Sequence, residues 1–119
     1  MHHPLLLEHF QNPRNAGELE GAGAVAEVSN PVCGDILKLW ARVQDGRIAE
    51  LRFKCRGCVA AMACGSALTE LASGLPPADA ARLAPSDVER AVGMLETASK
   101  HAAVLAIDAL RALLKPYLR

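Results

Sequence analysis

The 119-residue sequence has no net charge and no long apolar run, and both absences exclude classes of function. Thirteen Lys and Arg residues balance thirteen Asp and Glu residues, and the isoelectric point is about 6.9. This balance argues against a dominant nucleic-acid-binding or acidic-membrane surface. No apolar run approaches the ~18 residues that a transmembrane helix needs. We therefore expect neither nucleic acid nor a membrane as a partner.

Targeting and nucleotide-binding signatures are also missing from the sequence. Residues 1–4 lack the basic start and apolar core of a secretory signal, which predicts a cytoplasmic protein with reduced thiols. There is no serine nucleophile elbow, phosphate-binding loop or dinucleotide fingerprint, and no internal repeat. The composition, 51% hydrophobic and 22% charged, is that of a globular protein. Residues 1–119 are predicted to form a single domain.

The clearest local signal is a β-hairpin. Residues 36–43 alternate between apolar and polar side chains, and the following Asp45-Gly46 pair tolerates the positive φ angles of a tight turn. The second strand alternates again through the apolar residues Leu51, Phe53 and Cys55. Trp40 falls on the more polar face of this hairpin, where either the N-terminal segment or a partner covers it.

The other segments predict one more strand and several helices. Residues 4–10 predict a short helix that stops before Pro13, and residues 25–29 predict a strand. The rest of the chain predicts helices punctuated by glycine and proline, at residues 59–73, 78–83, 86–95 and 98–114. Strands followed by helices predict the α+β class, with helices packed on one face of an antiparallel sheet.

Four cysteines need an explanation in a chain that we expect to be reduced. Cys55 shares the apolar face of its strand, and Cys64 lies among small residues suited to close packing, so both are predicted to be structural thiols. Cys33 lies in a Pro- and Gly-containing turn, and Cys58 follows a glycine where a strand meets a helix. Nearby helix-terminal N–H groups are expected to favour the thiolate of Cys58, the form that binds soft metals.

Four side chains form the candidate site: Cys33, Asp35, Cys58 and His101. Asp35 lies two residues after Cys33, and His101 lies near the start of the last helix, where neutral imidazole is favoured. Two thiolates, a carboxylate and an imidazole match a tetrahedral zinc site or the anchors of an iron–sulfur cluster. Each residue also has a simpler interpretation, as an incidental turn thiol, a turn aspartate, a packed cysteine or a solvated histidine.

A thiol-redox role is a further alternative. Cys55 and Cys58 form a C-x-x-C pair between a strand and a helix, which is the context of a thioredoxin-like motif. That fold needs a βαβ unit before the motif and further strands after it. Here a hairpin precedes the pair and helices follow it, so we do not favour this interpretation.

The sequence resembles the IscU/NifU-type iron–sulfur cluster assembly scaffolds in four motifs that occur in the same order. They are EHFQNPRNAG at residues 8–17, NPVCGD at 30–35, FKCRGC at 53–58 and HAAVLAIDA at 101–109. The similarity runs from about residue 5 to residue 114. It implies a three-stranded antiparallel sheet with helices on one side and a long C-terminal helix.

The resemblance also implies a function and the roles of site residues. Scaffolds of this family receive sulfur from a cysteine desulfurase and iron separately, form a transient [2Fe–2S] cluster, and release it to apo-proteins. They are not enzymes in the usual sense. The resemblance assigns Cys33 as the first cysteine, Asp35 as the residue that keeps the cluster labile, and Cys58 as the second cysteine. His101 matches a histidine that can bind metal.

The sequence departs from the family pattern in two places. Ala102 stands where a third cysteine should follow His101, so the site loses one thiolate unless Cys55 or Cys64 replaces it. Residues 95–99 read LETAS where family members with a dedicated Hsp70-type chaperone carry LPPVK, which argues against that partner. The first hypothesis is thus a cluster scaffold. The alternative is a divergent zinc-binding member that binds or modulates a cysteine desulfurase without building clusters.

Overall fold

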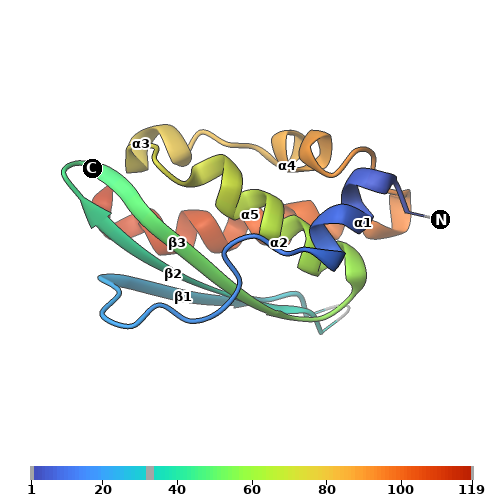
Figure 1. The fold of residues 1–119 in the computed structure, drawn as a ribbon, viewed down its shortest axis with the longest axis horizontal. Helices are drawn as coiled ribbons and strands as arrows, with labels where there is room; N and C mark the ends of the chain where they lie inside the picture. The colour runs from blue at the N-terminus through green and yellow to red at the C-terminus, as the bar shows by residue number, and fades with distance from the viewer. Residues whose placement is uncertain (1, 32–33, 119) are drawn as a thin grey trace.

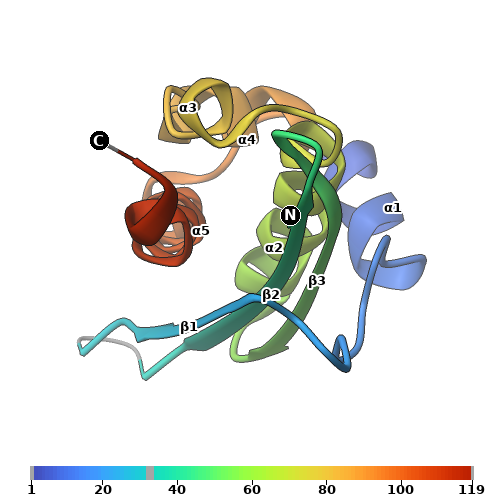
Figure 2. The same ribbon diagram turned by 90° about the vertical axis from the view of Figure 1, so that its left-hand side faces the viewer.

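A three-stranded antiparallel sheet carries all the helices on one of its faces (Figures 1 and 2). The computed structural model describes residues 2–31 and 34–118. Its elements are α1 (Pro4–Gln11), β1 (Ala24–Ser29), β2 (Ile36–Gln44), β3 (Arg47–Arg56), α2 (Val59–Ala72), α3 (Pro77–Ala80), α4 (Pro85–Ala91), the 3-10 turns η1 (Thr97–Ser99) and η2 (Lys115–Tyr117), and α5 (His101–Leu114). The predicted α+β class is confirmed.

The hairpin between β2 and β3 forms where the sequence predicts it. Asp45 and Gly46 have φ angles of 56° and 75°, so both central residues of the turn are left-handed. This is the geometry of a type I′ turn, whose twist matches that of the flanking strands. The turn sets the register of the nearest pairs, and a β-bulge between Arg42 and Val43 then shifts it by one residue. The shifted register places Leu39 opposite Phe53 on the face that the helices cover.

Helices α2 and α5 lie side by side against this apolar face (Figure 2). Leu37, Leu39 and Phe53 are buried beneath them. Small residues let α2 approach closely: a Cβ atom on Gly65 would lie 2.8 Å from Cδ2 of the Phe53 ring. At the edge of the core α1 packs on α2, and α4 packs on both α2 and α5. The result is one continuous core between the sheet and the helices.

Three helix boundaries differ from the sequence expectation. The helix predicted at residues 78–83 is α3, which ends at Ala80 rather than Leu83. Helix α4 ends at Ala91 rather than Leu95, because Gly93 adopts a left-handed φ of 87° that stops a helix. The last helix begins at His101 rather than Ala98, and the turn η1 precedes it. His101 therefore stands in the first turn of α5. None of the helices in the described ranges is long and apolar enough to cross a membrane.

The buried His9 ties α1 and the segment after it to α2. His9 Nδ1 and Ser66 Oγ share a hydrogen bond of 2.8 Å, and the backbone N–H of Arg14 donates to the same oxygen at 2.8 Å. Asn15 Nδ2 donates to Thr69 Oγ1 at 3.1 Å. The motif at residues 8–17 is therefore held to α2 by polar contacts. His9, which carries only a weak signal in the sequence, is one of the buried anchors.

We expect folding stability to fall between neutral and mildly acidic pH through His9. Burial, and then the nearby Arg14 guanidinium, lower the pKa of His9 below its ordinary value, although the carboxylates of Glu70 and Glu8 oppose the shift. The unfolded chain therefore binds a proton more readily than the folded chain. The contribution of neutral His9 to the free energy of unfolding is fully present above about pH 6.5, the ordinary histidine pKa. It is lost as the pH falls through the lowered pKa of His9 in the folded protein.

Urea unfolding between pH 5 and pH 8 measures this effect. His9→Gln should flatten the pH dependence of the free energy of unfolding relative to the unchanged protein. Equal slopes for the two proteins would show that His9 is not the titrating group.

Candidate functional site

The site forms where the ends of four elements meet. Asp35 directly precedes β2, Cys58 connects β3 to α2, and His101 is the first residue of α5. One donor atom from each of these three residues lies within 4.8 Å of the other two. The fourth predicted residue, Cys33, lies outside the described residues. The structure thus brings together three residues that are separated by up to 66 positions in the sequence.

Backbone pairing places Asp35 at this junction. The N–H of Asn30 donates to the carbonyl of Asp35 at 2.8 Å, which extends the β1–β2 ladder by one pair beyond Ser29 and Ile36. The N–H of Gly34, whose φ is 78°, donates to the Asn30 carbonyl at 2.7 Å. The connection between the two strands is therefore closed at its base, and Asp35 is held at a defined place beside the start of α2.

The buried carboxylate of Asp35 is the centre of the site. The side chain is only 4% exposed. Its Oδ1 accepts the backbone N–H of Cys58 at 3.1 Å. Its Oδ2 lies 3.4 Å from Cys58 Sγ and 3.4 Å from His101 Nε2. One carboxylate therefore touches both of the other site residues.

Cys58 is the N-cap residue of α2. Its Sγ accepts the N–H of Ala61 at 3.4 Å, so the predicted helix-terminal contact is present. The net effect on the thiol is nevertheless opposite to the sequence expectation. Burial, together with the hydrogen bond and negative charge of Asp35, raises the pKa of Cys58, and these causes exceed the lowering by the N–H groups. A bound dication would reverse this balance, because it attracts the thiolate and the carboxylate together.

His101 supplies the clearest sign that the site is made for a ligand. Its Nε2 atom is covered by protein and has no hydrogen-bond partner among the described residues, although Asp35 Oδ2 lies 3.4 Å away. Buried polar nitrogens rarely remain unsatisfied without a functional reason. An imidazole nitrogen facing a carboxylate and a thiol is well placed to coordinate a metal ion.

The three donor types suit a single metal ion, and the two separations that involve Asp35 fit one geometrically. With metal–ligand distances of roughly 2.0–2.3 Å, the donor atoms around a tetrahedral zinc ion lie about 3.3–3.8 Å apart. The separations of 3.4 Å from Asp35 Oδ2 to Cys58 Sγ and to His101 Nε2 fall in that range. Sulfur and imidazole nitrogen suit zinc and iron better than magnesium or calcium. These residues can therefore bind a borderline-soft metal.

The two cysteines predicted to be structural do not join this group of donors. Cys64 is fully buried on α2, and burial raises its pKa to about 12. Cys55 is half-buried, and burial, followed by the charges of Asp35 and Cys58, raises its pKa to about 12. The structural assignment of Cys64 is confirmed.

Sequence reasoning missed the importance of Gly57. A Cβ atom built on this residue would lie 2.6 Å from Cγ of Asp35, inside the space that the carboxylate occupies. A glycine directly before a site cysteine was visible in the sequence. The motif does not reveal which side chain fills the space that this glycine leaves. Only the fold shows that it is Asp35.

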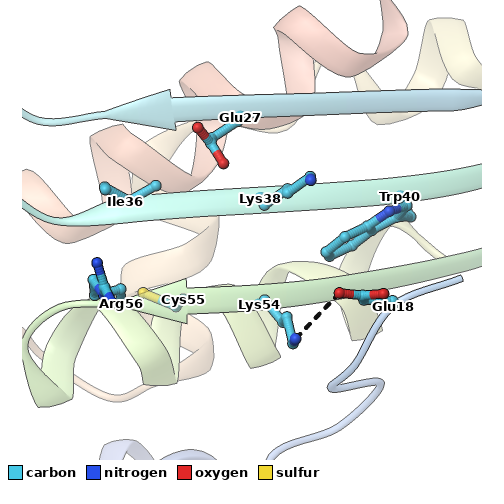
Figure 3. A pocket seen from close by; sticks show the side chains of 8 residues that line it. All are labelled: Glu18, Glu27, Ile36, Lys38, Trp40, Lys54, Cys55 and Arg56. Carbon is cyan, nitrogen blue, oxygen red and sulfur yellow. Dashed lines mark hydrogen bonds and ion pairs between the residues drawn. The ribbon is translucent and has the colours of Figure 1, made fainter.

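A separate hollow of about 410 Å³ lies on the face of the sheet opposite the helices (Figure 3). Trp40 lies in it with Lys38 Nζ 5.0 Å from its ring centroid. Glu18, from the N-terminal segment, pairs with Lys54 at 3.2 Å in the same hollow. Trp40 is only 7% exposed, so the protein itself covers most of this side chain. Asp35, Cys58 and His101 do not line this hollow.

Comparison with known proteins identifies the family. The model of the NifU-like N-terminal domain matches residues 1–119. The iron–sulfur cluster assembly scaffold protein IscU 1 of Archaeoglobus fulgidus is 40% identical over 119 residues, which cover 100% of this chain and 78% of that protein. The scaffold protein IscU of Aquifex aeolicus is 37% identical over 115 residues, which cover 95% of this chain and 73% of that protein.

Solved structures agree on the fold. A NifU-like N-terminal protein from Brucella abortus superposes with a TM-score of 0.74 at 19% identity, covering 95% of this chain and 91% of that one. A scaffold protein of the SUF system from Fervidobacterium islandicum gives a TM-score of 0.77 at 18% identity, covering 94% and 95%. The four motifs, the fold and these matches agree: the chain belongs to the family of NifU-like N-terminal domains.

Proposed function

We propose that this protein is a scaffold for iron–sulfur cluster assembly. It accepts iron and sulfur at Cys33, Asp35, Cys58 and His101, and it releases a [2Fe–2S] cluster to apo-proteins. The observation that carries the proposal is the convergence of Asp35, Cys58 and His101, whose Nε2 has no hydrogen-bond partner within residues 2–31 and 34–118. The names of the relatives from Archaeoglobus and Aquifex support it.

The cluster is the cargo of this site rather than a permanent cofactor. Two cysteine thiolates anchor the iron, because thiolate is its preferred soft ligand. The carboxylate and the imidazole complete the set with oxygen and nitrogen donors. A set with only two thiolates holds a cluster less firmly than four cysteines would, which suits a protein that must give the cluster away. The protein acts by holding and releasing this cargo, without catalytic turnover of its own.

The proposed role implies two kinds of partner in the cytoplasm. A cysteine desulfurase supplies the sulfur, and apo iron–sulfur proteins receive the finished cluster. Cys58 is exposed, which leaves this ligand open to solvent and hence to such partners.

A second function has its own supporting observation. The contacts of 3.4 Å among the three donors suit one metal ion, and Ala102 supplies no further donor. The alternative is therefore a zinc-binding member that modulates a cysteine desulfurase without building clusters. Cys33 would then complete a closed shell of two cysteines, one aspartate and one histidine.

Anaerobic reconstitution with ferrous iron, cysteine and a cysteine desulfurase distinguishes the two functions. For the scaffold we expect visible sulfide-to-iron charge-transfer bands, with iron and sulfide in equal amounts, and loss of both in Cys33→Ser. After an apo-ferredoxin is added and the two proteins are separated, the iron, the sulfide and the visible bands should be found in the ferredoxin fraction. A colourless protein that retains one equivalent of zinc in excess iron would reject the scaffold and favour the zinc-binding alternative.

A further inference from the structure

We propose that Gly57 is a positioning residue, whose missing side chain provides the space in which the Asp35 carboxylate reaches Cys58 and His101. The inference rests on the proposed metal site. It states that the position of one ligand in that site depends on Gly57, a residue that does not bind the metal itself. A Cβ atom on Gly57 would lie 2.6 Å from Cγ and 2.9 Å from Cβ of Asp35, and closer still to Oδ1. All three contacts are shorter than any that real Cβ atoms make.

The backbone does not explain this glycine. Gly34 and Gly46 have left-handed φ angles of 78° and 75°, where a side chain would be strained. Gly57 is not among the residues with positive φ, so its backbone conformation is open to any amino acid. The requirement at position 57 is therefore for space, and the group that occupies the space is the carboxylate of Asp35.

Asp35 has little freedom to move away from an added methyl group. It is 4% exposed, and its Oδ1 is bound to the N–H of Cys58, the residue next to Gly57. A methyl group at position 57 must push the carboxylate off this N–H. The same movement separates Oδ2 from His101 Nε2 and Cys58 Sγ. Gly57→Ala should thus remove the oxygen donor from the site while leaving every donor residue in the chain.

A cycle of variants tests this coupling with zinc ions alone as the probe. Gly57→Ala and Asp35→Gly should each weaken zinc binding by at least about tenfold, the lower end of the range for residues that orient metal ligands. The double variant should bind no more weakly than Asp35→Gly, because the methyl group then meets no carboxylate. Gly65→Ala is the matched control: its methyl group meets the Phe53 ring, so stability should change but zinc affinity should not.

The metal-free protein gives an independent readout of Asp35. The amide resonance of Cys58 in a ¹H–¹⁵N spectrum should have the same position in Gly57→Ala as in the double variant, since both lack the hydrogen bond to Oδ1 and both carry alanine at position 57. Unchanged zinc affinity in Gly57→Ala, or a double variant that adds the two losses, would overturn the inference. Absence of cluster formation by the unchanged protein would instead reject the scaffold function, and the amide shift would still report the position of Asp35.

Discussion

Cys58→Ser should abolish metal and cluster retention while leaving the fold intact. The thiolate is the softest donor among the described site residues, and a serine hydroxyl is a poor replacement for it. Outer hydrogen-bond partners of metal ligands contribute roughly 10–100-fold in affinity, so loss of the sulfur itself should exceed about a hundredfold. Because Cys58 is exposed and a serine is a favoured N-cap, circular dichroism should show an unchanged protein.

Cys64→Ser is the matched control for this result. Cys64 is fully buried against the sheet and lies outside the donor group, so its variant should keep its metal. A hydroxyl in that apolar contact should destabilise the fold by about 1–3 kcal/mol. Measuring the zinc content and the urea midpoint of both variants separates loss of metal from loss of stability. Full zinc retention in Cys58→Ser would remove Cys58 from the site, and zinc loss in Cys64→Ser would contradict its structural assignment.

The sheet was predictable because its signals are local. The alternation along β2 and β3 and the Asp45-Gly46 turn lie within about twenty consecutive residues, and turn chemistry sets the pairing next to the turn. The sequence did not predict the β-bulge between Arg42 and Val43, which shifts the rest of the pairing by one residue. Helix α2 was predictable for a similar reason, since Gly57 and Gly74 bracket a run of good helix formers. The end of α4 was misplaced, because the conformation of Gly93 is not specified by its neighbours.

The candidate site was only partly predictable. The residue types and their order suggested metal chemistry, but the approach of His101 to Asp35 depends on how α5 packs against the sheet. The pKa of Cys58 shows the same limit. Its helix N–H contact follows from sequence position, whereas burial and the charge of Asp35 arise only in the fold, and they decide the direction of the shift.

His9 illustrates how a family motif can report packing as well as chemistry. The segment at residues 8–17 is part of the resemblance, yet none of it belongs to the donor group. Its polar residues bind Ser66 and Thr69 of α2 instead. Since Cys58 is the N-cap residue of α2, this motif anchors the helix next to which a site cysteine lies.

Ala102→Cys should lengthen the lifetime of a bound cluster. Ala102 directly follows His101 in the first turn of α5, where the family pattern has its third cysteine. A thiolate there adds a soft ligand to a set that otherwise contains two. An added metal ligand should raise the affinity by at least as much as a hydrogen-bond partner of a ligand does. We therefore expect the half-life of the visible absorption in the presence of a chelator to rise by about tenfold or more.

Ala106→Cys separates this effect from that of adding a thiol to the helix. Both alanines are buried, and they lie four residues apart on the same face of α5, but Ala106 is one turn further from His101. Both substitutions add a sulfur to a packed core, at a cost of about 1–3 kcal/mol. A longer half-life in Ala102→Cys alone would mean that the natural alanine weakens retention and favours release. Equal half-lives in both variants would show that the helix directs position 102 into the core, out of reach of the metal.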